Sequence, residues 1–172
     1  FDAQYIDIEN TGIDGWMIGV RASQKARLNQ VLATLNELSD SYHSVLDIGC
    51  GIGIFGSLLK NVISVKNYVG SDISEKAIKY ANSKGEYASN YYHCILPEIP
   101  TTGAKYDLVL LLEVLYYLNS REQTLAMKNI IGSMESQAYI CITGSTSNEN
   151  YFSNDFFNNL HTVGLKLISE TH

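Results

Sequence analysis

The stretch that decides the fold is VLDIGCGIGIFGSLL, from Val45 to Leu59. Its first residues are an apolar run that predicts a buried strand over 45–48, and its last residues have the apolar spacing of a helix over 54–59. Between them stand Gly49, Gly51 and Gly53. Glycines at a strand-to-helix turn allow the backbone to approach a ligand closely, because they carry no side chain. The stretch therefore predicts a ligand-binding turn at the carboxyl end of a strand.

Strands and helices alternate on both sides of this turn. The helical spacing of apolar residues predicts helices over 22–38, 74–81, 121–131 and 154–161. Apolar runs predict further strands over 68–71, 91–94, 106–112, 138–143 and 165–169. This alternation is typical of right-handed crossovers in a doubly wound, mostly parallel α/β sheet with helices on both faces. In such a sheet, ligands bind outside the carboxyl ends of the strands.

Composition restricts the classes of function. The chain has 172 residues, the size of one domain, and 45% of them are hydrophobic, which excludes intrinsic disorder. The net charge of −6 argues against a general nucleic-acid binder, so no nucleic-acid partner is expected, and an RNA or protein substrate recognised through a local patch remains an alternative. Arg21, Lys25 and Arg27 lie along one predicted helix and are interpreted as its solvated face. No signal peptide and no membrane span are expected, because no apolar stretch of the given sequence approaches the roughly 20 residues that span a membrane.

The three cysteines indicate a reducing compartment and no metal site. Cys50, Cys94 and Cys141 are widely spaced and lack the pairing typical of zinc ligands. Buried, reduced thiols are typical of intracellular proteins, so a cytoplasmic location is expected.

Two aspartates end neighbouring predicted strands. Asp47 precedes the glycines, where a carboxylate would repel a pyrophosphate but suit an ammonium or a hydroxyl group. Asp72 ends the next strand, where it can accept hydrogen bonds from both hydroxyls of a ribose. Because Gly51-x-Gly53-x-x-Gly56 also fits the dinucleotide fingerprint, an NAD-dependent oxidoreductase remains an alternative. Asp47 argues against that alternative.

Three segments together carry a family resemblance. VLDIGCGIG at 45–53, VGSDIS at 69–74 and YDLVLLLEVLYYL at 106–118 resemble the class I S-adenosylmethionine-dependent methyltransferases in order, spacing and context. The resemblance extends over about 45–143. It implies a Rossmann-like methyltransferase fold, S-adenosylmethionine as cofactor and S-adenosylhomocysteine as product. The sheet of this family usually ends in an antiparallel hairpin, and the chain has room for only its first strand, so the final antiparallel strand is expected to be missing.

The resemblance also implies roles for individual residues. Asp47 and the glycine turn would hold the methionine portion of the cofactor, Asp72 the ribose hydroxyls, and Ile73 with the residues after the third strand the adenine. Leu112 and Glu113 would lie beneath the sulfonium and face the acceptor. The expected cofactor-binding residues are Asp47, Gly49, Cys50, Gly51, Gly53, Asp72, Ile73, Cys94, Ile95, Leu112, Trp16 and Arg21.

The first 20 residues are interpreted as an irregular arm and residues 21–172 as the methyltransferase domain, with excision from a larger protein left open. In this family such an arm lies over the cofactor. Trp16 would be a lid or an anchor to the core, and Arg21 would pair with the cofactor carboxylate or lie on the surface. IDGWMIGVRASQKARL, at 13–28, is loosely similar to nodulation-factor-type small-molecule methyltransferases, which methylate sugar-derived acceptors.

Methyl transfer from a sulfonium is an in-line displacement, so alignment and exclusion of water dominate its catalysis. Candidate catalytic residues are Glu113, Tyr116 and His93, each with a second interpretation: a carboxylate that organises the cofactor pocket, a packed aromatic ring and a buried histidine. The expected activity is methyl transfer to oxygen or nitrogen of a small-molecule acceptor, with a sugar or saccharide intermediate as a candidate. The alternative is a catalytically inactive cofactor-binding domain of a larger protein.

Overall fold

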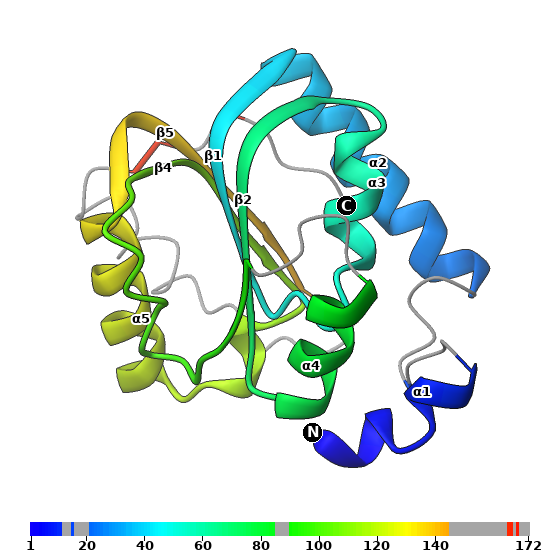
Figure 1. The fold of residues 1–172 in the computed structure, drawn as a ribbon. Coiled ribbons are helices and arrows are strands. Elements are labelled where there is room, and N and C mark those ends of the chain that lie inside the picture. The colour runs from blue at the N-terminus through cyan, green and yellow to red at the C-terminus, as the bar shows by residue number, and fades with distance from the viewer. Residues whose placement is uncertain (12–14, 16–20, 85–89, 145–164, 167, 169–172) are drawn as a thin grey trace.

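The computed structural model describes residues 1–11, 15, 21–84, 90–144, 165–166 and 168 (Figure 1). A five-stranded sheet in the order β3-β2-β1-β4-β5 forms its centre, and every neighbouring pair of strands is parallel. The doubly wound parallel α/β sheet predicted from the sequence is thus confirmed. The strands are β1 (Ser41–Ile48), β2 (Ser64–Asp72), β3 (Tyr91–His93), β4 (Tyr106–Leu112) and β5 (Met134–Thr143).

Helices cover both faces of this sheet. Figure 1 places α2 and α3 on one side and α5 on the other. The α-helices predicted over 22–38, 54–59, 74–81 and 121–131 are present, within a few residues at their ends. The described helices are η1 (Asp2–Tyr5), α1 (Ile8–Thr11), α2 (Ala22–Leu38), α3 (Ile54–Lys60), α4 (Glu75–Lys84), η2 (Leu115–Tyr117) and α5 (Ser120–Gly132).

The core consists of two apolar layers, because successive strand residues point to opposite faces of the sheet. Val45 belongs to the layer beneath α2, α3 and α4, and its neighbour Leu46 belongs to the layer beneath α5. Leu108 and Val109 of β4 alternate in the same way. All four side chains are fully buried. This burial on both faces explains the unbroken apolar run of β4 over 108–112.

The strand order reverses between β1 and β4, because the chain extends the sheet from β1 through β2 to β3 and then returns to the other side of β1. Ile48 lies in register with Ser71 of β2 and with Leu111 of β4. The carboxyl ends of these three strands therefore meet at one edge of the sheet. This edge is where ligands of doubly wound sheets bind.

The sequence underestimates three strands. β1 begins at residue 41, β2 at residue 64 and β5 at residue 134, each four positions before the predicted starts at 45, 68 and 138. The three extensions are rich in polar residues (SYHS, SVKN and MESQ), so a search for apolar runs does not detect them. The predicted helix over 154–161 lies outside the described residues. The predicted strand over 165–169 is described only at 165, 166 and 168, and these positions belong to no strand.

Candidate functional site

The turn between β1 and α3 uses three alternate glycines for their backbone freedom. The φ angle is +77° at Gly49, +54° at Gly51 and +83° at Gly53, all in the left-handed region that side chains disfavour. A Cβ atom at Gly49 would lie 2.3 Å from a methyl group of Val114, in the segment that follows β4. The glycine spacing seen in the sequence therefore reflects both conformation and close contact.

Asp72 joins this turn to the end of β2. Its Oδ2 accepts the N–H of Gly51 at 2.9 Å, and its Oδ1 accepts the N–H of Ser74 at 2.8 Å. Burial raises the pKa of Asp72, and these two hydrogen bonds oppose the shift. The carboxylate is thus fixed at the edge of the sheet. Each of its oxygens retains a lone pair for a further donor.

Asp47 is buried on the sheet face that α2 and α3 cover. Its side chain is 2% exposed, and its Oδ2 accepts a hydrogen bond of 2.5 Å from the hydroxyl of Tyr68 on β2. Burial raises the pKa of Asp47 to about 7, the hydrogen bond from Tyr68 opposes that rise, and the charge of Asp72 adds to it. Asp47 therefore gains or loses a proton near neutral pH.

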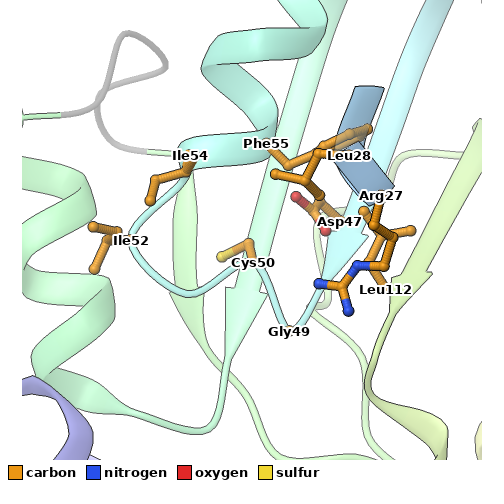
Figure 2. Close-up of a pocket in the computed structure, with 9 residues that line it drawn as sticks. All are labelled: Arg27, Leu28, Asp47, Gly49, Cys50, Ile52, Ile54, Phe55 and Leu112. Carbon is orange, nitrogen blue, oxygen red and sulfur yellow. The ribbon is translucent and has the colours of Figure 1, made fainter. Parts of the chain in front are cut away.

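A small pocket opens where the glycine turn, the end of β4 and α2 meet (Figure 2). Its volume is about 30 Å³, which holds water molecules but not a nucleoside. It brings together four of the predicted cofactor-binding residues: Asp47, Gly49, Cys50 and Leu112. The complete lining is Arg27, Leu28, Asp47, Gly49, Cys50, Ile52, Ile54, Phe55 and Leu112.

Arg27 is the site residue that the sequence reasoning misplaced. The sequence predicted that Arg27 lies on a solvated helix face. In the structure its side chain is only 28% exposed and lines the pocket (Figure 2). Its Nη1 lies 3.0 Å from Oε1 of Glu113, and its Nε is buried without a hydrogen-bond partner among the described residues. By contrast, Arg21 is exposed at the N-cap of α2 and does not line the pocket.

Helical spacing was the signal that could have found Arg27. Positions 27, 31 and 35 are four residues apart and therefore lie on one face of a helix. Val31 and Leu35 form part of the buried face of α2, and Leu28 adjoins Arg27 on it. A cationic side chain on the buried face of a helix is expected to point toward the protein core or toward a binding site at the edge of the core.

Glu113 occupies the strained position directly after β4. Its φ of +61° is uncommon for a residue with a side chain. Its N–H donates to both the carbonyl oxygen and the hydroxyl oxygen of Thr143, each at 3.1 Å. Such strain is concentrated at functional sites and persists where neighbouring bonds hold it. Thr143 therefore fixes the point from which the Glu113 side chain extends to Arg27.

Two tyrosines follow Glu113 on η2. The ring of Tyr116 lies 4.5 Å from that of Tyr117, and Tyr117 also meets Phe1 of the arm edge-on at 5.2 Å. Burial raises the pKa of Tyr116, and contacts with Tyr117 and Glu113 add to the shift. Tyr117 is 47% exposed. The structure thus brings the predicted catalytic residues Glu113 and Tyr116 together and adds exposed aromatic surface beside them.

His93, the third predicted catalytic residue, is not part of this group. It ends β3, which β2 and β1 separate from β4. Its Nε2 lies 3.0 Å from the carbonyl oxygen of Ile73, and its Nδ1 lies 3.6 Å from Oε1 of Glu75. The side chain is exposed, so the interpretation as a buried histidine is wrong. An edge strand has solvent on one side, which the strand pattern alone does not reveal.

The residues predicted around the adenine form an apolar surface at the same edge. Ile73 and Ile95 are large apolar side chains that are 38% and 51% exposed. They follow β2 and β3, and the N–H of Cys94 donates to the backbone carbonyl of Asp72 at 3.0 Å. This hydrogen bond joins the two loops beside the Asp72 carboxylate.

The described part of the arm is more ordered than the irregular segment expected. Tyr5 on η1 and Ile8 on α1 are buried against Ala77 of α4. Asp2 accepts a hydrogen bond of 2.5 Å from the hydroxyl of Ser74, the residue that precedes α4. Burial of two large side chains explains why the arm forms short helices. Trp16 lies outside the described residues.

Neither a metal site nor a membrane span is found in the described part of the chain. It contains no group of three or more His, Cys, Asp or Glu side chains placed to hold a metal ion. Among its helices, none combines the length and the apolar character needed to cross a bilayer.

Comparisons with known proteins agree with this architecture. Nodulation protein S of Bradyrhizobium diazoefficiens is 28% identical over 149 residues, which are 85% of this chain and 69% of that protein. The crystal structure of the N-methyltransferase NodS from Bradyrhizobium japonicum WM9 with S-adenosylhomocysteine has a TM-score of 0.66 at 23% identity and covers 80% of this chain and 69% of its own. The sugar N-methyltransferase KedS8 from Streptoalloteichus has a TM-score of 0.62 at 18% identity, and the match covers 73% of this chain and 50% of that protein.

The family assignment rests on the central part of the chain. The profile of the methyltransferase-domain family matches residues 45–136, from the first residues of the glycine-turn stretch to the start of β5. This span contains the glycine turn, Asp72 and Glu113, which are the features that the sequence singled out. The chain therefore belongs to the methyltransferase-domain family, as a class I S-adenosylmethionine-dependent methyltransferase.

Proposed function

We propose that this methyltransferase transfers the methyl group to an amino group of a small saccharide-type acceptor. Two observations support the acceptor class: the relative at 28% identity is Nodulation protein S, and the structural neighbours include an N-methyltransferase and a sugar N-methyltransferase. The observation that carries the proposal is the position of Glu113 directly after β4, where it contacts Tyr116, whose ring lies against the exposed ring of Tyr117.

The edge of the sheet fits S-adenosylmethionine in three places. Asp72 retains lone pairs for the two ribose hydroxyls. Ile73 and Ile95 offer exposed apolar surface to the two faces of the adenine. Arg27 has a buried Nε without a partner among the described residues, and this donor suits the carboxylate of the methionine portion. Arg27 thus replaces Arg21 in the role that the sequence suggested.

In this proposal, the small pocket at the glycine turn lies under the methionine end of the cofactor. Asp47, Gly49, Cys50 and Leu112 line it (Figure 2). Because a pocket of about 30 Å³ is too small for a nucleoside, the nucleoside lies outside it in this proposal, across the glycine turn. The open backbone of Gly51 and Gly53 permits this close approach.

In the reaction, the bound cofactor supplies a methyl group on a positively charged sulfur. An amine attacks only when it is neutral, so its proton must leave before or during the transfer. The Glu113 carboxylate is placed to bind the ammonium form of the acceptor and to accept that proton. Tyr117 offers a flat surface for a sugar ring, while Tyr116 is held by its contacts with Tyr117 and Glu113. His93 takes no part in this chemistry and would instead hold the Ile73 loop through its carbonyl oxygen.

A matched set of acceptors tests the proposal. Glucosamine oligosaccharides offer a free amine, their N-acetylated forms block it, and the corresponding glucose oligosaccharides replace it with a hydroxyl. Release of S-adenosylhomocysteine only with the free amine would support N-methylation. Turnover of the hydroxyl form would contradict it. Cofactor binding without turnover on any amine would favour the inactive-domain interpretation.

A further inference from the structure

One ion pair connects the proposed cofactor site with the proposed acceptor site. Arg27 extends from α2 into the pocket (Figure 2). Its Nη1 lies 3.0 Å from Oε1 of Glu113. The two side chains are 28% and 18% exposed, so solvent screens their attraction less than it would at the surface. The residue proposed to hold the cofactor carboxylate and the residue proposed to bind the acceptor are therefore partners of each other.

Arg27 is not saturated by this pair. A guanidinium has five N–H donors in a planar fork and binds a carboxylate best through two parallel hydrogen bonds. In the structure, Glu113 contacts Nη1, while the buried Nε has no hydrogen-bond partner among the described residues. An incoming carboxylate near Gly49 can bind Nε and Nη2 along the free edge of the guanidinium, and its negative charge then weakens the attraction between Arg27 and Glu113.

We propose that Arg27 exchanges partners during the catalytic cycle. In the free enzyme it holds Glu113, and when the cofactor site is filled it binds the cofactor carboxylate and releases Glu113 toward the acceptor. This inference rests on the proposed function. Its consequence is an ordered reaction, because the Glu113 charge becomes available to an ammonium group only after Arg27 has a new partner.

The backbone of Glu113 does not need to move in this exchange. Its N–H is held by the carbonyl and hydroxyl oxygens of Thr143, which fix the left-handed conformation. Rotation about the side-chain bonds alone can move the carboxylate away from Arg27, on the side where it already contacts Tyr116. The exchange is therefore a rearrangement of two side chains rather than of the fold.

Calorimetric titration tests the exchange with two ligands. S-adenosylhomocysteine carries the carboxylate, whereas 5′-methylthioadenosine retains the nucleoside but lacks the amino-acid portion. Glu113→Gln removes the competing charge, so we expect it to bind S-adenosylhomocysteine about two- to fivefold more tightly than the wild type, the range expected for loss of a partly exposed ion pair. Its affinity for 5′-methylthioadenosine stays unchanged.

The Arg27 variants complete the thermodynamic cycle. Arg27→Gln weakens S-adenosylhomocysteine binding by about tenfold or more and leaves 5′-methylthioadenosine unaffected. Adding Glu113→Gln to Arg27→Gln then produces no further tightening. Arg27→Lys, which keeps the charge but not the fork, gives an intermediate affinity and serves if Arg27→Gln fails to fold.

Two outcomes would overturn the exchange. The first is weaker binding of S-adenosylhomocysteine to Glu113→Gln, which would mean that Glu113 supports the cofactor instead of competing with it. The second is equal tightening of both ligands, which would mean a general change in the pocket. Because these titrations need no acceptor, they remain informative if the acceptor panel contradicts the proposed function.

Discussion

The hydroxyl of Tyr68 on β2 lies 2.5 Å from Oδ2 of Asp47 on β1, and both side chains are buried. The pair sits within the face of the sheet that α2 and α3 cover, directly before the glycine turn. Burial disfavours the ionised carboxylate and raises the pKa of Asp47 to about 7, while the hydrogen bond from Tyr68 limits that rise. The pKa of Asp47 therefore lies close to neutral pH.

This raised pKa predicts a stability that falls with pH. The pKa of Asp47 is about 7 in the folded chain against an ordinary value of 3.8. Between these values the folded chain retains a proton that the unfolded chain releases, so the free energy of unfolding decreases as pH rises from about 4 to about 7. Asp47→Asn removes this contribution. Urea unfolding at about pH 5 and about pH 8 should show the variant gaining stability relative to wild type at the higher pH.

Tyr68→Phe provides the control for this pH dependence. Without the hydroxyl, the ionised carboxylate loses a hydrogen bond, so the pKa of Asp47 rises further and the loss of stability extends to higher pH. A stability difference between wild type and Asp47→Asn that does not change with pH would contradict the raised pKa.

Asp72→Ala is expected to weaken cofactor binding about ten- to a hundredfold, because a hydrogen-bonded charged group is worth about 1.5–3 kcal/mol. Calorimetric titration with S-adenosylhomocysteine measures this loss. Asp40→Ala is a matched control, since Asp40 is exposed just before β1 begins, at the opposite end of that strand. Equal affinity of wild type and Asp72→Ala for the ligand would exclude Asp72 from the cofactor site.

Gly49→Ala and Gly103→Ala separate backbone strain from steric overlap. Both glycines have positive φ, +77° and +72°, so each alanine costs about 1–2 kcal/mol in backbone conformation. Only at Gly49 does the new Cβ meet a neighbour, Val114, at 2.3 Å, which adds about 1–3 kcal/mol. We expect urea unfolding to show a clearly larger loss for Gly49→Ala. Adding Val114→Ala should recover part of the lost stability. No recovery would show that overlap with Val114 is not the cause of the larger loss.

Tyr117→Ala is expected to raise the KM for a saccharide acceptor about two- to tenfold, as loss of one aromatic contact predicts. Tyr117→Phe keeps the ring and should remain close to wild type. The affinity for S-adenosylhomocysteine should not change in either variant. Leu125→Ala is the control, because Leu125 is similarly exposed on α5 but lies away from the strand ends. An acceptor KM that responds equally to Leu125→Ala would argue against a sugar surface at Tyr117.

Part of the candidate site could be predicted because it follows strand ends. The glycine turn, Asp72 and Glu113 each come directly after an apolar run, and parallel strands place their carboxyl ends at one edge. Arg27 does not follow a strand end. Helical spacing places it on the buried face of α2, but the group that it meets there depends on how the helix packs against the sheet. His93 was misplaced for a related reason: the sequence locates a strand but not its position at the sheet edge.

The amino-acid sequence by itself determined the alternation of strands and helices, the open turn at Gly49, Gly51 and Gly53, and the family to which the chain belongs. These features depend on local periodicity and on the conformations available to individual residues. Only the tertiary structure decided that Arg27, and not Arg21, faces Glu113, and that Tyr68 reaches Asp47. Such pairs join residues from different elements, and their distances are fixed by how α2 and β2 pack around β1, which no local pattern specifies.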